Sequence, residues 1–388
     1  MDKQNKKKIL IVTGTRAEYG LLRSTIRAMT KSAVLEPSIL ATGMHFLKAH
    51  GRTIDDIYAD NWRIGAKKVF VKEVPVSEGD SMVGMLVKEL KGIETYCASH
   101  RPDVILVLGD RDEAFAGAVV GAHLGVPIAH IHGGDSTGGV VDDGLRHAIS
   151  KFSHVHFTIC AKSSRAVQKL GEEPWRIHMV GAPGLDGLIT DRFKTKAELS
   201  KEFNLDPREP WIIVLQHPAP LDSTPIAGQI TPTLAAVKKV RGQKIAIYPN
   251  RDTGSNKIIH ELVRFTKDPA WKLFPHLRRG DYLSFFKCAD VLVGNSSSGI
   301  IESTFFHLPT INIGKRQEGR ERGKNVIQVN YNEAQISKAL TLAMSSRFYK
   351  IARAATHPYG KGGAGKKIVA ALEKEIFNPR LTHKNYVT

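Results

Sequence analysis

Short runs of apolar, mostly β-branched residues recur along the chain, separated by longer stretches in which apolar and polar residues are mixed. Val104–Leu108 is the clearest of these runs, because five apolar residues stand together and Gly109 ends them. A run of this length is typical of a strand buried on both faces, as in a parallel sheet. Comparable runs predict strands at residues 8–12, 38–41, 68–71, 127–131, 155–160, 177–180, 211–215, 244–248, 290–294 and 309–313.

The stretches between these strands have the spacing or the composition of helices. Residues 81–99 place apolar side chains at roughly helical intervals, and residues 114–124 are rich in small residues. Strands that alternate with helices predict parallel sheets joined by right-handed crossovers. Further helices are predicted at residues 21–30, 163–170, 300–307 and 366–376, with one more beginning near Asp142.

The alternation pauses once, over residues 186–210, where the sequence is polar, helical and carries two prolines. The series of strands begins again at Trp211. We therefore predict an α/β protein with two Rossmann-like, doubly wound domains facing a central cleft, at residues 1–186 and 187–365. Residues 366–388 are predicted to form a C-terminal helix and tail that pack back on the first domain.

Composition narrows the class of protein. The chain has 388 residues, of which 42% are hydrophobic, and this is enough for two hydrophobic cores. No run of 18 apolar residues occurs, so we expect no membrane-spanning helix. The basic N-terminus leads into a predicted strand at Ile9 rather than into the apolar core of a signal peptide. Three widely spaced cysteines fit a reducing cytosol, so we expect a cytoplasmic protein without disulfides.

The formal net charge of +18 bears on the partner of the protein. Nucleic acid is one explanation of such a charge. However, the positive residues are dispersed, and the sequence has no nucleic-acid-binding motif with interleaved aromatic residues. A substrate that carries phosphates explains a basic cleft at least as well. We therefore expect a negatively charged small molecule as the partner, and no nucleic acid.

Ionisable residues gather after two consecutive strands of the first half. Because ligands bind at the carboxyl ends of the strands in open α/β sheets, we expect several of these residues to converge on one cleft. An ionisable group near a sheet edge also carries a desolvation cost unless it is used. The candidate catalytic residues are Asp110, His132, Asp135, Asp142, Asp143 and Arg146.

Simpler roles exist for some of these residues. Asp142 could serve only as a helix cap, and Asp143 with His147 has the i,i+4 spacing of a helical pair worth about 0.3 kcal/mol. His130 and His132 point to the same side of one predicted strand, so a metal site is conceivable there. A complete set of ligands is not visible, and we expect no metal.

Two stretches have the chemistry of an anion site. Gly14–Gly20 turns from a strand into a helix, and Arg16 beside the helix start can grip a phosphate. Asn295–Gly299 offers hydroxyls, backbone N–H groups and a helix start, and Glu302 could accept from a ribose diol. The plainer alternatives are a surface arginine and a cluster of helix caps. Further candidates in the second half are His217, His276, Ser296, Ser297, Ser298 and Arg316.

Taken together, these motifs make the chain similar to a known family. It resembles the hydrolysing UDP-N-acetylglucosamine 2-epimerases over residues 9–376, nearly the whole chain. The non-hydrolysing epimerases are the nearest alternative, but they typically carry proline, threonine and arginine where this chain has Ala17, Arg111 and Pro218. The motifs that carry the resemblance are Gly14–Leu22, Gly109–Arg111, His130–Asp135, Asp142–Ile149, Gln216–Pro218, Pro249–Ser255 and Gly294–Gly299.

The resemblance implies a fold of the glycosyltransferase-B type and a reaction. The reaction converts UDP-N-acetylglucosamine to N-acetylmannosamine and UDP, the entry to sialic acid synthesis. Close relatives act on UDP-diacetamido-trideoxy sugars on the route to legionaminic acid. Neither group uses a metal or a nicotinamide, so we expect no cofactor, and a homodimer or homotetramer is implied. The resemblance also adds Arg111, Asn250, Asp252 and Ser255 to the expected UDP-binding residues.

The implied chemistry is anti elimination of UDP to a 2-acetamidoglucal, followed by addition of water with inversion at C2. Asp110 and either Asp142 or Asp143 would supply the base and the acid. Arg146 would keep one of these carboxylates ionised. Asp135 and His132 would orient the sugar or the water. Two other classes stay open: a glycosyltransferase of the same fold, which would need an acceptor, and a non-catalytic protein that binds nucleic acid.

Overall fold

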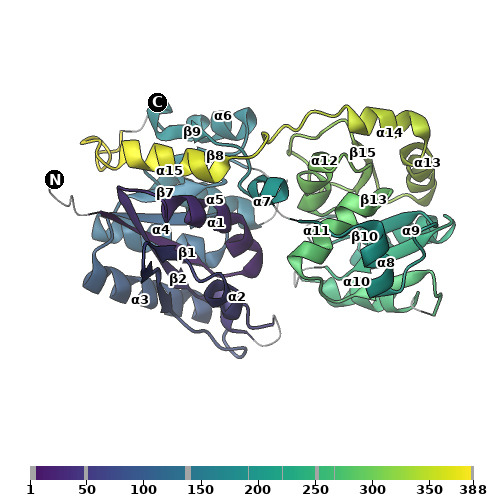
Figure 1. Cartoon of the computed structure of the whole chain (residues 1–388), viewed down its shortest axis with the longest axis horizontal. Helices are drawn as coiled ribbons and strands as arrows, with labels where there is room; N and C mark the ends of the chain where they lie inside the picture. The colour runs from purple at the N-terminus through teal and green to yellow at the C-terminus, as the bar shows by residue number, and fades with distance from the viewer. Residues whose placement is uncertain are drawn as a thin grey trace. The chain divides into compact units, whose positions relative to one another are not determined.

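The computed structural model describes residues 6–47, 51–135, 141–190, 192–220, 222–249, 253–265 and 267–385, and of residues 141, 142 and 190 only the backbone. The chain divides into two compact α/β units (Figure 1). The first lies within Met1–Asp135, Val141–Gly187 and Tyr359–Thr388, and the second within Leu188–Pro358. The chain therefore enters the second unit beside the predicted boundary and returns to the first at Tyr359, before the predicted residue 366.

The first unit is built on a seven-stranded parallel sheet with the order β5-β2-β1-β6-β7-β8-β9. Because β1 lies between β2 and β6, the strand order reverses beside β1, and the carboxyl ends of β1 and β6 flank a topological switch point. The strands are β1 (Lys7–Thr13), β2 (Leu35–Ala41), β5 (Phe70–Glu73), β6 (Val104–Leu108), β7 (Ile128–Ile131), β8 (Val155–Thr158) and β9 (Ile177–Met179).

Helices cover both faces of this sheet. Ile9 and Ile11 of β1 are fully buried in a cluster with residues of α1 and α15, whereas Leu10 and Val12 are fully buried on the other face, with residues of α3 and α4. Burial on both faces explains why the central strands are continuous apolar runs in the sequence. These helices are α1 (Arg16–Met29), α3 (Met82–His100), α4 (Asp112–Leu124) and α15 (Ala364–Glu375).

The second unit repeats the design with a six-stranded parallel sheet, in the order β12-β11-β10-β13-β14-β15. Its apolar side chains pack into one cluster on each face, with α9 and α13 on one side and α8 and α11 on the other. The strands are β10 (Trp211–Leu215), β11 (Gln243–Ile247), β12 (Trp271–Phe274), β13 (Val291–Gly294), β14 (Thr310–Ile313) and β15 (Val326–Val329). The helices include α8 (Lys196–Phe203), α9 (Ile226–Lys238), α10 (Ser255–Val263), α11 (Arg279–Cys288), α13 (Glu333–Ala343) and α14 (Ser346–Arg353).

The first helix begins earlier than the sequence predicts. α1 starts at Arg16 rather than at residue 21, because the Thr15 hydroxyl accepts a hydrogen bond from the backbone N–H of Glu18 at 3.1 Å. This is a regular N-cap, and it satisfies one of the N–H groups that a helix start leaves without a partner. The loop between β1 and α1 is therefore only Gly14 and Thr15, and Arg16 sits on the first turn of the helix.

The predicted helix at residues 300–307 is confirmed only over Glu302–Phe305. The chain instead forms a 3-10 turn at Ser297–Gly299 and a four-residue helix, α12 (Glu302–Phe305). The hydroxyls of Ser303 and Thr304 donate to the carbonyl oxygens four residues earlier, at 2.6 and 2.8 Å. Such hydroxyl bonds compete with the backbone bonds that would extend a helix.

The C-terminal segment belongs to the first unit. α15 packs against α1, and Asp186 caps α15 by accepting from the backbone N–H groups of Ala364 at 2.9 Å and Gly365 at 2.7 Å (Figure 1). Beyond α15, the fully buried Arg176 donates to the carbonyl oxygen of Leu381 at 3.0 Å. It also donates to the carbonyl oxygens of Arg380 and His383. A single buried guanidinium therefore holds three backbone carbonyls of the tail.

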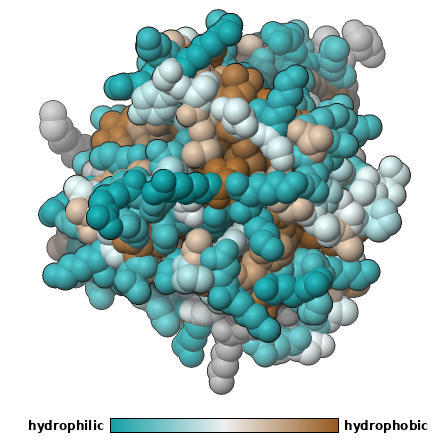
Figure 2. Space-filling model, turned by 90° about the vertical axis from the view of Figure 1, so that its right-hand side faces the viewer, coloured by the Kyte–Doolittle hydropathy of each residue, from teal (hydrophilic) through white to brown (hydrophobic). Residues whose placement is uncertain are grey.

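Ion pairs use part of the positive charge of the chain. Lys88 pairs with Asp80 at 2.7 Å in the first unit, and Arg241 pairs with Glu209 at 2.6 Å in the second. Figure 2 shows hydrophilic side chains over most of one face, with smaller apolar areas between them. Within the residues that the structure describes, no helix is long and apolar enough to cross a membrane.

Candidate active site

The first candidate site lies at the carboxyl edge of the first sheet, where β1, β6 and β7 end. The loops Gly14–Thr15, Gly109–Arg111 and His132–Asp135 follow these three strands directly. Adjacent parallel strands end at one edge, so the topology brings the three loops together at the switch point. This is the convergence that the sequence predicts for Asp110, His132 and Asp135.

Arg146 joins two of these loops. Its side chain is 3% exposed, and its Nη2 atom is paired with Oδ2 of Asp110, whose side chain is 22% exposed. Its Nη1 atom donates to the backbone carbonyl of His132 at 3.3 Å. Arg146 belongs to α5 (Val141–Phe152), so the helix after β7 carries the cation that places the carboxylate after β6. The guanidinium is buried, whereas the carboxylate that it holds remains accessible to a ligand.

His132 and Asp135 form a second pair beside the first. Nδ1 of His132 bonds to Oδ2 of Asp135 at 3.0 Å, and the other oxygen of Asp135 accepts from the Ser163 hydroxyl at 2.5 Å. With Nδ1 occupied, Nε2 of His132 is the ring atom left for chemistry, and it is buried with no hydrogen-bond partner among the described residues. His132 also has a left-handed backbone, at φ +69°, which costs about 1–2 kcal/mol and is typical of functional sites.

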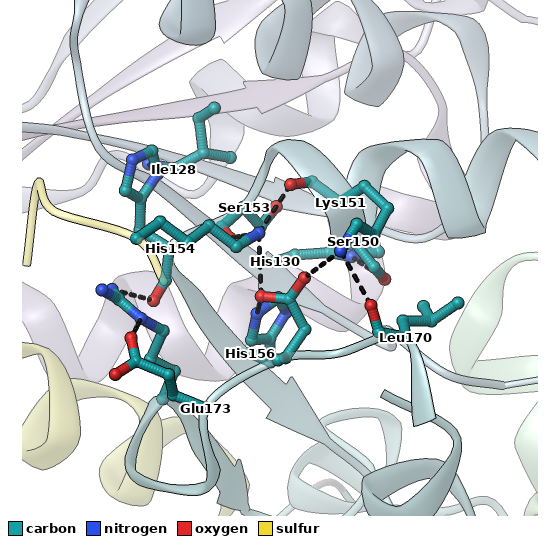
Figure 3. Close-up of polar contacts among 12 residues, drawn as sticks. Ile128, His130, Ser150, Lys151, Ser153, His154, His156, Leu170 and Glu173 are labelled. Atoms are coloured by element: carbon teal, nitrogen blue, oxygen red, sulfur yellow. Dashed lines mark hydrogen bonds and ion pairs between the residues drawn. The ribbon is translucent and has the colours of Figure 1, made fainter. Parts of the chain in front are cut away.

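His130 has a structural role. It is fully buried, its Nε2 atom lies 2.7 Å from the carbonyl oxygen of Gly109, and its Nδ1 atom lies 3.1 Å from the Ser150 hydroxyl (Figure 3). Burial lowers its pKa to about 3, so the ring is neutral. It therefore supports Gly109, the residue before Asp110. Among the described residues, no three His, Cys, Asp or Glu side chains are placed to hold a metal ion.

The remaining candidates of the first half lie on or at the start of the helices that follow these loops. Arg16 pairs with Asp56 at 3.3 Å, between Nε and Oδ2, and its side chain is 31% exposed. Arg111 is the N-cap residue of α4, and Asp143 lies half-buried on α5. The side chain of Asp142 lies outside the described part of the chain, so the choice between Asp142 and Asp143 stays open.

In the second unit, residues from three adjacent strand ends meet at the carboxyl edge of the sheet. Asn295, after β13, accepts from the backbone N–H of His217 at 2.7 Å and donates to its carbonyl oxygen at 2.9 Å. Arg316, after β14, donates to the carbonyl oxygen of Asn295 at 3.2 Å. Burial, and then the charge of Arg316, holds the pKa of His217 well below its ordinary value. The ring of His217 is therefore neutral and lies beside a cation. A neutral ring of this kind can donate one hydrogen bond to a phosphate.

The serine cluster is ordered differently from our prediction. Because α12 has only four residues, it supplies no substantial helix dipole to an anion. Instead, the Ser296 hydroxyl accepts from the backbone N–H of Ser298 at 3.4 Å, while Ser297 begins the 3-10 turn. Tyr282 of α11, which the sequence analysis missed, bonds to the side chains of Ser298 and Ser296, with Glu302 nearby. Tyr282 could not be found from the sequence, because no pattern of residue types indicates that its hydroxyl reaches these serines.

The other candidates of the second half lie at strand ends or outside the described residues. Ser255 is the buried first residue of α10, and His276 is exposed in the loop after β12. Both follow strands of the second sheet at its carboxyl edge. Asn250 and Asp252 lie outside the described residues.

The sequence model of the UDP-N-acetylglucosamine 2-epimerase family matches residues 27–373. The chain belongs to this epimerase family. The resemblance inferred from the motifs is thereby confirmed.

Relatives of this epimerase cover between 87% and 98% of its length. The UDP-N,N'-diacetylbacillosamine 2-epimerase (hydrolyzing) of Legionella pneumophila is 33% identical over 97% of this chain and 98% of its own. The polysialic acid biosynthesis protein P7 of Escherichia coli is 31% identical over 98% of this chain and 97% of its own. The UDP-N-acetylglucosamine 2-epimerase of Neisseria meningitidis is 33% identical over 87% of this chain and 88% of its own.

Solved structures of similar proteins share the fold of the epimerase. A Neisseria meningitidis UDP-GlcNAc 2-epimerase bound to UDP-GlcNAc has a TM-score of 0.81 at 18% identity, over 95% of this chain and 100% of its own. A Methanocaldococcus jannaschii UDP-GlcNAc 2-epimerase in complex with UDP-GlcNAc and UDP has a TM-score of 0.74 at 19% identity, over 95% and 99% of the two chains. The predicted fold class, two doubly wound α/β units with parallel sheets, is confirmed.

Proposed function

We propose that this epimerase is of the hydrolysing kind and converts UDP-N-acetylglucosamine to N-acetylmannosamine and UDP. The observation that carries the proposal is the pairing of Asp110 with Arg146 beside His132 and Asp135, at the switch point of the first sheet. Two relatives with "hydrolyzing" in their names, at 33% and 29% identity over nearly the whole chain, support the same class of reaction.

In the first step, a base removes the proton from C2 of the sugar, and the C1–O bond to UDP breaks. The electron pair of the C2–H bond forms the C1–C2 double bond of a 2-acetamidoglucal, and UDP leaves with the bond electrons. We propose that Asp110 and either Asp142 or Asp143 supply the base and the acid of the reaction. The Arg146 cation favours the ionised form of Asp110, as a base requires.

In the second step, water adds across the double bond of the glycal. Hydroxide from water joins C1, and a proton joins C2 from the face that inverts its configuration. Asp135 fixes the ring of His132 through Nδ1, so Nε2 is the atom proposed to orient the sugar or the water. The same two groups that removed a proton and released UDP then return a proton, so the enzyme ends in its starting state.

The binding of UDP is proposed to need no metal. Charge on the leaving diphosphate would be stabilised by arginine side chains, a neutral histidine and hydrogen-bond donors placed in advance. The proposed set comprises Arg16, Arg111, His217, Asn250, Asp252, Ser255, His276, Ser296, Ser297, Ser298, Glu302 and Arg316.

A second substrate has a specific observation in its favour. Two relatives that match nearly all of this chain carry names that specify UDP-N,N'-diacetylbacillosamine, at 33% and 29% identity. The same elimination and addition would apply, because the second acetamido group is remote from C1 and C2. We propose UDP-N-acetylglucosamine as the main substrate and the diacetamido sugar nucleotide as the alternative.

The test is a direct comparison of the two sugar nucleotides at equal concentration. The purified chain is incubated with each, and kcat/KM is measured from the release of UDP, with the sugar product identified by chromatography against standards. Higher kcat/KM with UDP-N-acetylglucosamine supports the main proposal, and the reverse order supports the alternative. Formation of UDP-N-acetylmannosamine, with UDP still attached, would show the non-hydrolysing reaction instead.

The setting of the reaction is also a proposal. We propose a cytoplasmic enzyme that works as a homodimer or homotetramer, as the family resemblance implies. No disulfide joins the three cysteines at positions 97, 160 and 288, and this supports a reducing compartment. Light scattering coupled to gel filtration would give the mass in solution, and a mass of one chain would contradict the oligomer.

A further inference from the structure

Two buried glutamates stand directly behind the loops of the first candidate site. Glu18 lies in the first turn of α1, after the loop Gly14–Thr15, and Glu113 lies in the first turn of α4, after Gly109–Arg111. Each side chain belongs to a residue that is only 5% exposed. Both are therefore buried acids and not surface residues, and neither takes part in the proposed reaction.

Glu18 holds the end of β1 in place. One of its carboxylate oxygens, Oε2, accepts from the backbone N–H of Gly14 at 2.7 Å and from the Thr13 hydroxyl at 3.2 Å. Its other oxygen, Oε1, is buried and has no hydrogen-bond donor among the described residues. A buried carboxylate oxygen without a donor lowers the stability of the fold, so we expect a donor close to it.

Glu113 brings a second carboxyl group beside that of Glu18. Its carboxyl group packs onto Gly14 so closely that a Cβ atom at this glycine would lie 2.3 Å from Cδ of Glu113. The carboxyl groups of Glu18 and Glu113 lie within hydrogen-bonding reach of each other, and Oε1 of Glu113 also has no donor among the described residues. Two carboxylates cannot hydrogen bond without a proton, whereas one proton between them gives a partner to both.

The charges around the pair favour retention of that proton. Burial is the largest cause that raises the pKa of Glu18 and of Glu113, and for Glu18 the neighbouring charge of Glu113 adds to it. Arg111 opposes this effect, while Asp112 adds negative charge. The buried Glu89 of α3 lies in the same surroundings, and its pKa is raised to about 8 by burial and by the charges of Glu113 and Asp112. Like charges this close in a buried site do not both ionise.

We propose that Glu18 and Glu113 share one proton, and that this bond holds the loop Gly14–Thr15 against the loop Gly109–Arg111. The two glutamates are then positioning residues, because they act through Arg16 and Asp110 and do not touch the substrate. This part of the inference rests on the proposed function. The shared proton itself does not, since it follows from the contacts of the two side chains.

The test compares the full-length protein with Glu113→Gln, Glu18→Gln and a surface control, Glu94→Gln, whose native side chain is 50% exposed on α3. A glutamine keeps the shape and donates to the remaining carboxylate, but it has no proton to lose. The unfolding constant of each protein is measured in urea at several pH values from 5 to 8.

The folded wild type retains a proton that the unfolded chain has lost in this range. Its extra stability is therefore present at low pH and is lost as the pH rises, by tenfold in the unfolding constant per pH unit. The ratio of the wild-type unfolding constant to that of Glu113→Gln should rise by that factor, and Glu94→Gln should follow the wild type. A ratio that stays within twofold from pH 5 to pH 8 overturns the shared proton.

Two further measurements keep the test decisive. If neither glutamine variant folds, the wild type labelled with ¹³C at its glutamate carboxyl carbons is titrated by NMR, with the signal of Glu89 identified from Glu89→Gln because its own pKa is raised to about 8. Titration of every other glutamate below pH 6 overturns the proposal. The positioning role is tested by kcat/KM up to pH 10, where the alkaline fall should move up by at least one unit in Glu113→Gln. An unmoved fall overturns positioning, whereas a wild type inactive on every UDP-sugar overturns the proposed function alone.

Discussion

Asp110 owes its position to one buried cation, and this makes it the residue most open to a decisive substitution. In Asp110→Asn the side chain keeps its size but can neither pair with Arg146 as a carboxylate nor remove a proton. We expect kcat to fall by about 10²–10⁴-fold, the usual contribution of a positioned base. The affinity for UDP, measured by calorimetry, should stay within threefold of the wild type.

The matched control for this variant is Asp103→Asn, at the opposite end of β6. Asp103 accepts from the backbone N–H of Lys8 at 2.8 Å and pairs with Lys7 at 3.0 Å, away from the candidate site. Its replacement should leave kcat within twofold. Near-normal turnover of Asp110→Asn would remove Asp110 from the mechanism.

The pair of His132 and Asp135 gives a second test at the level of single residues. Asp135→Asn can no longer fix the ring through a charged acceptor, so His132 loses its preferred tautomer and orientation. We expect kcat to fall by about 10²-fold or more. Ser163→Ala removes the hydrogen bond behind Asp135 together with the bond between its hydroxyl and Sγ of Cys160. We expect a loss of about tenfold, because one such bond to a charged group contributes about 1.5–3 kcal/mol at most. Equal, small effects of both variants on kcat would contradict the proposed role of His132.

At the scale of residues, the sequence predicts which candidate residues lie together after the strands of the first sheet, but it does not single out the buried glutamates. Four residues could be predicted to meet, because they follow neighbouring buried strands and parallel strands end at one edge of the sheet. They are Asp110, His132, Asp135 and Arg146. Glu18 could not be predicted, because a glutamate in the first turn of a helix looks like an ordinary partner of the helix dipole. Only its burial, which depends on contacts between distant segments, marks it as unusual.

At the level of elements, the loops differ from their prediction more than the strands do. The stretch after β13 has the composition of a helix start, yet serine and threonine hydroxyls bond to nearby carbonyls and the helix shrinks to four residues. The binding of an anion there would therefore depend on side chains and single N–H groups. A pattern of residue types does not distinguish a helix cap from a hydroxyl that interrupts the helix.

The C-terminal tail offers a test of an element by its stability. Lys384, whose side chain is 9% exposed, pairs with the buried Glu172 at 2.8 Å and donates to the carbonyl oxygen of Ser153 at 2.8 Å. Glu172 also bonds to His156 at 3.0 Å, on the strand beside His130 (Figure 3). Lys384→Met would leave Lys151 as the remaining cation of Glu172 and would remove the bonds to two carbonyl oxygens, so we expect the free energy of unfolding to fall by about 1.5–3 kcal/mol.

The control for the tail is Lys374→Met, because the side chain of Lys374 is 80% exposed and should change the free energy of unfolding by less than about 0.5 kcal/mol. Both variants are measured by urea unfolding at one pH. Equal stabilities of Lys384→Met and the wild type would show that the tail is not held by this ion pair.

For the whole molecule, the fold could be predicted because its central strands are buried on both faces and therefore read as uninterrupted apolar runs. β6 and β10 are fully buried along their length, and both were predicted to within a residue. β12 and β15 were missed because they form the two edges of the second sheet. Their residues are only partly buried, and their pattern lacks a continuous apolar run.

The proposed chemistry also predicts a property of the whole enzyme, its independence of metal. Arg316, Arg16 and the neutral His217 are proposed to stabilise the leaving diphosphate, so removal of divalent ions should not slow the reaction. We expect kcat in excess EDTA to equal kcat in magnesium within experimental error. A loss of activity in EDTA that magnesium restores would contradict this assignment.

The most direct test of the central claim is an NMR time course with UDP-N-acetylglucosamine in heavy water. Elimination followed by addition takes the C2 proton away and returns one from solvent. We therefore expect free UDP and N-acetylmannosamine that carries deuterium at C2. N-acetylmannosamine with its original proton at C2, or UDP-N-acetylmannosamine with UDP still attached, would contradict it.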